Sequence, residues 1–241
     1  MCTVTYVPAP EGFTLTHNRD EAASRSLFTI ERQKTKDGDT LLFPRDATAG
    51  GTWFITSSAG KTACLLNGAF VLHQRQLPYR RSRGLMMLDF FDYPNPYDFF
   101  EHYDFERIEP FTFLFFEPGK VLEFRWDATK KYVKSLPANQ AHFWCSATLY
   151  PAEMQAKRAA VFYDWLATQA AGKAANPEGI LKLHLKGSVG DPAYDFVMNR
   201  DGRVQTVSIT QVLSRKKVAR MRFFDLLEGN RDERRISLTK R

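Results

Sequence analysis

The residues with the clearest chemical potential lie near the start of the chain. Cys2 follows the initiator methionine, and the segment Asn18–Glu21 comes soon after it. Removal of Met1 would leave Cys2 with a thiol and a free α-amino group, whose reference pKa values are about 8.5 and about 7.7–8.0. The neutral amine can then act as the base for the thiol of its own residue, without a histidine. We therefore predict that Cys2 is an N-terminal nucleophile.

Such a nucleophile needs a partner for its amine, a nearby positive charge and donors for an oxyanion. Asp20 is predicted to accept a hydrogen bond from the amine, and Arg19 is predicted to favour the thiolate or to hold a substrate carboxylate. Asn67 and the region of Ser146 are predicted to supply the oxyanion donors. These residues define a candidate hydrolytic site.

Each of these features also has a simpler interpretation. Cys2 could be an incidental small residue near the terminus, and Asn18–Glu21 could be a turn that carries surface charges. The pair Asn67-Gly68 is typical of a turn. His17 could face the site, although packing or surface exposure is the more frequent fate of such a residue. These alternatives stay open at the level of sequence.

A hairpin is the element that would position the candidate residues. Segments 2–7 and 13–18 are rich in Thr, Val, Tyr and Phe, which is typical of strands, and Pro8–Gly12 between them has turn chemistry. In an antiparallel hairpin the start of the first strand lies opposite the end of the second. Cys2 and the stretch from Asn18 to Asp20 are therefore expected to be neighbours in space.

The remaining elements alternate in blocks of strands and blocks of helices. Strands are predicted at 52–57, 62–67, 111–117, 121–127, 142–146, 195–199, 203–210 and 219–224. Helices are predicted at 82–91, 96–103, 151–171 and 177–185. This order favours an α+β fold with antiparallel sheets covered by helices over a parallel doubly wound sheet. No linker or repeat divides the chain, so residues 1–241 are expected to form a single domain.

Composition and charge exclude several classes of function. The formal net charge is +7, and much of the excess lies in segments 79–83 and 214–217 and in the last residues. No nucleic-acid motif accompanies this charge, so we interpret the basic segments as solvated surface and expect no nucleic-acid partner. No apolar run could span a membrane and no secretory signal is evident, so a cytoplasmic protein is expected.

The cysteines are too few and too widely spaced for a disulfide framework or a zinc site. The chain has three, at positions 2, 64 and 145. Cys64 and Cys145 are predicted to be inert buried thiols. We therefore expect neither a metal nor a cofactor.

Several short motifs together resemble the NRDE family, which includes the transport and Golgi organisation protein two and its relatives. The matching segments are Met1-Cys2-Thr3, Asn18–Glu21, Arg25, Arg45-Asp46, Gly50–Trp53, Leu65–Asn67 and Ser82-Arg83-Gly84. The match is strong over residues 1–90 and thinner afterwards. Any one of these motifs alone would be weak, whereas the combination is specific.

The resemblance implies an N-terminal nucleophile (Ntn) hydrolase-like fold, a four-layer αββα sandwich of two antiparallel sheets flanked by helices. It also implies similarity to cysteine-type Ntn amidases of the choloylglycine hydrolase and penicillin acylase group. In many family members an asparagine stands where this chain has Ser146. The implied catalytic residues are Cys2, Arg19, Asp20 and Asn67, and the implied substrate-binding residues are Asn18, Glu21, Arg25, Trp53 and Ser146.

Two functions follow as hypotheses. In the first, Cys2 cleaves a C–N bond in a non-peptide or short linear amide, which is a small-molecule substrate. In the second, the same fold is a non-catalytic binding or trafficking protein for haem or a lipid-like ligand, as the family's links to haem movement and lipid metabolism imply. Covalent haem is excluded because the chain lacks a Cys-x-x-Cys-His motif. A fold that has lost its chemistry is a third possibility.

Overall fold

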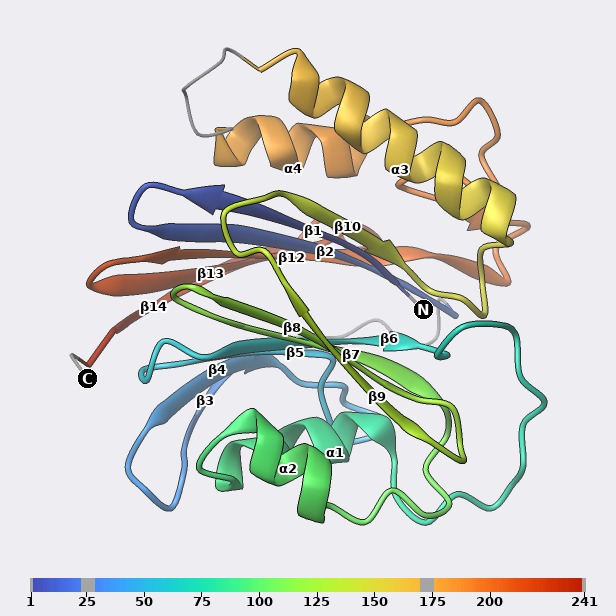
Figure 1. Cartoon of the computed structure of the whole chain (residues 1–241). Helices are drawn as coiled ribbons and strands as arrows, with labels where there is room; N and C mark the ends of the chain where they lie inside the picture. The colour runs from blue at the N-terminus through green and yellow to red at the C-terminus, as the bar shows by residue number, and fades with distance from the viewer. Residues whose placement is uncertain (1, 23–28, 170–175, 240–241) are drawn as a thin grey trace.

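The computed structural model describes residues 2–22, 29–169 and 176–239. Two antiparallel sheets stack face to face, and helices cover the outer face of each sheet (Figure 1). The four layers confirm the αββα sandwich predicted from the sequence. None of the helices within these ranges is long and apolar enough to cross a membrane.

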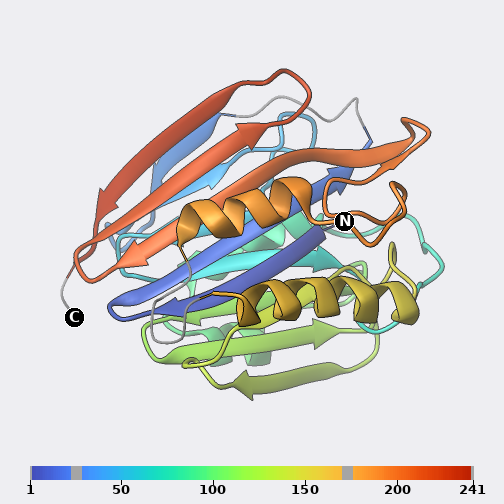
Figure 2. The same ribbon diagram turned by 90° about the horizontal axis from the view of Figure 1, so that it is seen from above.

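The first sheet contains the amino-terminal hairpin at its centre, in the order β10-β1-β2-β12-β13-β14, with β11 paired to β12. Its strands are β1 (Cys2–Ala9), β2 (Gly12–Glu21), β10 (His142–Cys145), β11 (Asn199–Arg200), β12 (Val204–Arg215), β13 (Val218–Asp225) and β14 (Arg231–Ser237). The helices α3 (Ala152–Ala167) and α4 (Pro177–Lys186) run across its outer face (Figure 2).

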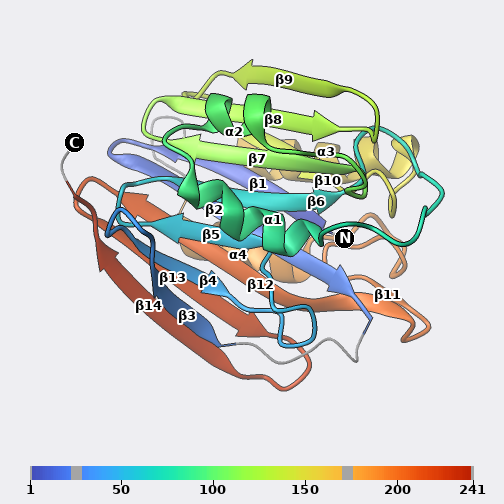
Figure 3. The ribbon, with the colours of Figure 1, turned by 90° about the horizontal axis from the view of Figure 1, so that it is seen from below.

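The second sheet follows the order of the chain, from β3 to β9. Its strands are β3 (Ile30–Lys34), β4 (Thr40–Pro44), β5 (Phe54–Ser57), β6 (Thr62–Asn67), β7 (Phe111–Glu117), β8 (Lys120–Trp126) and β9 (Lys131–Leu136). The helices α1 (Arg83–Asp89) and α2 (Pro96–His102) and the 3-10 helix η2 (Phe90–Asp92) cover its outer face (Figure 3).

The predicted hairpin is confirmed, and its register places Cys2 directly opposite Arg19. Side chains alternate between the two faces of a strand. Val4, Tyr6 and Leu15 pack between the two sheets, whereas the Thr3 side chain is bonded to helix α3. The hairpin therefore presents one face to the space between the sheets and the other to the helices.

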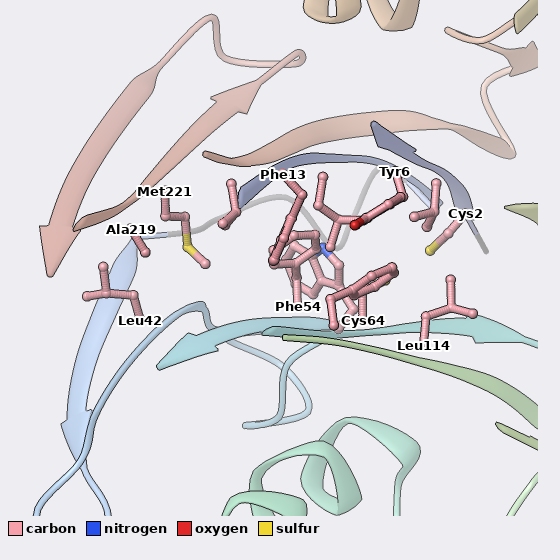
Figure 4. Packing of buried hydrophobic residues seen from close by; sticks show 14 of the residues in the cluster. Cys2, Tyr6, Phe13, Leu42, Phe54, Cys64, Leu114, Ala219 and Met221 are labelled. Carbon is pink, nitrogen blue, oxygen red and sulfur yellow. The ribbon is translucent and has the colours of Figure 1, made fainter. Parts of the chain in front are cut away.

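Two apolar layers hold the sandwich together. Between the sheets, Tyr6 stacks on Phe116 with ring centroids 5.3 Å apart, and Cys2 lies at one end of this layer with its sulfur directed into the inter-sheet space (Figure 4). Beneath the second sheet, phenylalanines from the strands pack against those of the helices. Phe100 of α2 stacks on Phe124 of β8 at 3.8 Å. Burial of these rings accounts for the high phenylalanine content of the chain.

The predicted strand at 195–199 is wrong except for its last residue, because the segment before β11 is irregular. Its polar groups do not form strand hydrogen bonds. The Arg158 guanidinium donates to the carbonyls of Tyr194 and Asp195, and the Val189 N–H donates to the Asp195 carboxylate. The predicted helix at 151–171 ends at Ala167, and its expected stop at Gly172 lies outside the described residues.

Candidate active site

Cys2 lies at the start of β1, between β2 and β10, and only 3% of its surface is exposed. Cys2 is nevertheless one of the residues that line a cavity of about 530 Å3, together with Arg19 and Asn67. The backbone of Cys2 is held in place by a hydrogen bond of 2.9 Å from the Ser146 N–H to its carbonyl. A buried cysteine therefore borders a hollow large enough for part of a small molecule.

Arg19 is fixed along the cavity wall beside the thiol. Its Nη2 lies 2.6 Å from Oδ2 of Asp46, and the two side chains are only 6% and 9% exposed. The guanidinium also stacks on Trp53, with 4.1 Å between Cζ and the ring centroid. The other carboxylate oxygen of Asp46 accepts the N–H groups of Thr48 and Ala49, which fixes the carboxylate in turn. The Arg45-Asp46 and Gly-Thr-Trp motifs thus supply the support for Arg19.

Asp20 follows Arg19 and therefore points to the opposite face of β2. Its carboxylate accepts hydrogen bonds of 2.7 Å from the hydroxyls of Tyr150 and Thr206. Burial raises the pKa of Asp20, and the nearby Arg158 guanidinium opposes that rise. Asp20 does not line the cavity, so the two adjacent side chains lie in different surroundings. Its predicted bond to the amine of Cys2 stays a prediction.

The protonation of Cys2 is decided mainly by its burial. Burial raises the pKa of the Cys2 thiol, the Asp20 carboxylate raises it further, and Arg19 lowers it. The thiol is therefore protonated at neutral pH, and attack on a carbonyl requires a base that removes its proton.

No histidine within the described ranges lines the cavity. His17 lies between the sheets against Phe54, and burial lowers its pKa to about 3. His184 of α4 is buried on the helix side, where Nδ1 lies 2.6 Å from Oδ1 of Asn18, and burial lowers its pKa to about 3 as well. Both rings are neutral at physiological pH, and neither contacts the thiol.

Asn67 ends β6, as the sequence predicted, and it lines the cavity, whereas Ser146 does not line it. The role of Asn67 as an oxyanion donor stays a prediction. The Ser146 hydroxyl donates to the Asn67 carbonyl at 2.7 Å, and the Ser146 N–H donates to Cys2. Ser146 therefore joins the strand that carries Cys2 to the strand that carries Asn67. Gly68 follows Asn67 and has φ 80°. A Cβ at Gly68 would lie 2.6 Å from the Thr148 side chain, so glycine permits the close approach of the segment after β6 to the segment after β10.

Only some of the other predicted binding residues line the cavity. Glu21 and Trp53 do so. Asn18 does not, because its amide donates to the carbonyls of His184 and Phe196 on the helix side of the sheet. Arg25 lies outside the described residues, as does Met1.

The sequence did not predict the wall formed by Glu109 and by most residues between Arg75 and Gly84, Gln76 and Arg80 excepted. Segment 79–83 is not simply solvated surface, because the Arg83 side chain is only 13% exposed and its Nη2 lies 2.9 Å from Oε2 of Glu109. Burial lowers the pKa of the Arg83 guanidinium, whereas Glu109 raises it. A signal was present in the Ser82-Arg83-Gly84 motif, which begins α1 with Ser82 as its N-cap.

Gly51 and Gly84 bring this wall into contact with the segment that supports Arg19. A Cβ on Gly51 would lie 2.4 Å from the Gly84 carbonyl carbon, and the Thr52 N–H donates to the Gly84 oxygen at 3.1 Å. Only glycine permits this backbone approach. Elsewhere in the described ranges, no three His, Cys, Asp or Glu side chains gather closely enough to hold a metal ion.

Comparison with known proteins agrees with this architecture. The sequence matches the protein family described as Transport and Golgi organisation 2 over residues 1–169. The structure resembles penicillin V acylase from Agrobacterium tumefaciens, with a TM-score of 0.55, 10% identity, and 100% of this chain and 87% of that chain covered. A comparison with curated proteins finds no match.

Two further solved structures are similar. A mutant conjugated bile acid hydrolase from Clostridium perfringens has a TM-score of 0.57 at 9% identity, with 100% of this chain and 97% of that chain covered. An N-acylethanolamine-hydrolyzing acid amidase ortholog from Caenorhabditis elegans has a TM-score of 0.54 at 11% identity, with 87% and 92% covered. At these identities the likeness shows the fold, which is that of the Ntn hydrolases.

Proposed function

Because the chain belongs to the Transport and Golgi organisation 2 family, we propose that it is an Ntn hydrolase that cleaves a C–N amide bond through Cys2 after removal of Met1. One observation carries this proposal: the side chain at the start of the first strand is a thiol that lines a cavity beside a fixed arginine. The substrate is a non-peptide or short linear amide. The Ntn-hydrolase fold supports the proposal, since it provides the scaffold for this chemistry.

The free α-amine of processed Cys2 supplies the base that the buried thiol lacks. It takes the thiol proton as Sγ attacks the amide carbonyl carbon, and the electron pair of the carbonyl moves to its oxygen. The Asn67 side chain and backbone N–H groups stabilise that oxyanion. When the C–N bond breaks, the ammonium returns the proton to the leaving amine, and a thioester remains on Cys2. Water then hydrolyses the thioester and releases the carboxylic acid.

Arg19 and Asp20 act from the two faces of β2 in this scheme. Arg19 holds positive charge beside Sγ and favours the thiolate as it forms. Asp20, fixed by the hydroxyls of Tyr150 and Thr206, supports the amine from the helix side. The adjacency of the two residues in sequence thus suits two separate tasks.

The test begins with the intact mass of the purified chain, which must show loss of Met1. A thiol-directed acylating probe should then label the processed protein and fail to label Cys2→Ala. Cys64→Ala is the matched control, because Cys64 is also buried between the sheets but does not line the cavity. Retention of Met1, or labelling that survives in Cys2→Ala, would contradict the proposal. A panel of N-acyl amides then identifies turnover.

The placement of Ser146 favours a second candidate, ligand binding without turnover. Its hydroxyl holds the Asn67 carbonyl and so provides no oxyanion donor in the cavity. The same cavity is lined by apolar Leu77 and Tyr79 and by arginines. In this second candidate the apolar residues contact the haem ring and the arginines bind its propionates. A stoichiometric Soret shift on haem titration, equal in the native chain and Cys2→Ala, together with no amide turnover, would favour binding alone.

A further inference from the structure

Four arginines line the cavity, and three of them are held by a carboxylate at close range. These pairs are Arg19 with Asp46 at 2.6 Å, Arg81 with Asp89 at 2.5 Å, and Arg83 with Glu109 at 2.9 Å. Each of these guanidinium groups is therefore committed to the structure of the wall.

Arg75 is the exception. It lines the cavity, and 69% of its side chain is exposed. Its one hydrogen bond within the described ranges runs from Nε to Oε1 of Glu109, at 3.3 Å. Glu109 is already paired with the buried Arg83, and His73 approaches the same oxygen at 3.2 Å. The two Nη groups of Arg75 therefore have no partner in the described part of the chain, and they form a fork that can bind an anion.

The loop that carries Arg75 also presents apolar surface to the cavity and to solvent. Leu77, Pro78 and Tyr79 line the cavity, and Leu77 is 73% exposed. Earlier in the same loop, Phe70–Leu72 are exposed large apolar residues. The loop projects beyond the sheets at the end of the sandwich that holds the amino terminus (Figure 1). A ligand at this mouth would therefore meet apolar side chains and an available guanidinium together.

We propose that Arg75 selects amide substrates that carry a carboxylate or sulfonate as well as an apolar acyl chain, of which N-acyl amino acids are the simplest. The anion bonds to the Nη groups of Arg75, and the acyl chain packs on the apolar loop. The substrate class rests on the proposed hydrolytic function, whereas the binding preference can be measured without turnover.

The experiment uses the full chain with Cys2→Ala, which retains the cavity but cannot form a thioester. Calorimetry compares N-lauroylglycine with the neutral N-lauroylethanolamine, both below the concentration at which they form micelles. We expect the anionic probe to bind at least about tenfold more tightly, since a charge-assisted bidentate pair exceeds a neutral hydrogen bond by that order. N-lauroyltaurine should share the preference if the negative charge, rather than carboxylate shape, is recognised.

Arg75→Gln in the same background should bring the affinity for the anionic probe close to that for the neutral one. Arg80→Gln is the matched control: this arginine lies in the same loop but pairs with Asp104 outside the cavity. The control should keep the preference.

Equal binding of the two probes, no measurable binding of N-lauroylglycine, or a preference that survives Arg75→Gln would overturn the proposal. These outcomes are distinct from a failure of the hydrolase proposal. If Cys2 is not labelled and yet the preference depends on Arg75, the hydrolase is refuted and the anion site stands. If labelling succeeds and the preference is absent, the reverse holds.

Discussion

Replacing Asp46 by asparagine tests whether a buried ion pair holds Arg19 beside the thiol. Both partners are almost inaccessible to solvent. Removing one charge from such a pair leaves the other desolvated and costs about 3–5 kcal/mol. The asparagine oxygen can still accept the N–H groups of Thr48 and Ala49, and Arg19 keeps its stacking on Trp53. We therefore expect the free energy of unfolding to fall by about 2–3 kcal/mol, which is at or just below the lower limit of that range.

Urea denaturation followed by tryptophan fluorescence measures this loss. Glu153→Gln provides the control, because its ion pair with Lys157 on α3 is exposed to solvent and screened, so no measurable change is expected. The rate of Cys2 acylation should also fall in Asp46→Asn, since Arg19 is no longer fixed near Sγ. A loss of stability no larger than that of the control, with an unchanged labelling rate, would refute the reasoning.

Two further predictions concern stability. Burial lowers the pKa of His17 to about 3 in the folded state, against about 6.5 in the unfolded state. The unfolded state therefore binds more protons below about pH 6.5. As a result, the free energy of unfolding falls as the pH drops from about 6.5 towards about 3. Urea titrations should show a loss of about 2 kcal/mol from this residue between pH 7 and pH 5, and His17→Leu should reduce the pH dependence by that amount; an unchanged dependence would contradict the assignment. Gly51→Ala should cost about 1–3 kcal/mol and slow Cys2 labelling, because the new methyl group meets the Gly84 backbone. A fully stable Gly51→Ala protein would show that the two walls can separate without cost.

The hairpin could be predicted from local patterns because its evidence is local. Turn residues lie between two runs of strand-forming residues, and antiparallel geometry alone then places Cys2 opposite Arg19. The starts of two helices could be predicted from local patterns as well. Ser82 and Asn95 both act as side-chain N-caps where the sequence predicted helices. These features depend on neighbours within a few residues along the chain.

The remainder of the site depends on contacts between distant segments, which a single sequence does not reveal. Asp46 meets Arg19 because the two sheets stack, whereas Glu109 meets Arg83 because the start of α1 contacts the segment before β7. The arginines of segment 79–83, which are typical of a solvated surface, contribute to the cavity wall through Arg81 and Arg83, each paired with a carboxylate. Among the strands that the sequence did not predict, β3, β9 and β14 are mainly polar and exposed, so their sequences lack the alternation that marks a half-buried strand. The strand β4 was also missed; it is a short buried run without that alternation.

The family tetrapeptide gains a physical meaning from strand alternation. Arg19 and Asp20 cannot serve one cavity from one face, since consecutive side chains leave opposite sides of β2. Arg19 shares the inter-sheet face with Cys2, and Asp20 shares the helix face with Asn18, whose amide bonds to the segment that follows α4. The strand therefore places a cation beside the thiol and a carboxylate behind the backbone that carries it. In the proposed mechanism the base is the amine of Cys2 itself, so a buried thiol with a raised pKa is compatible with that proposal.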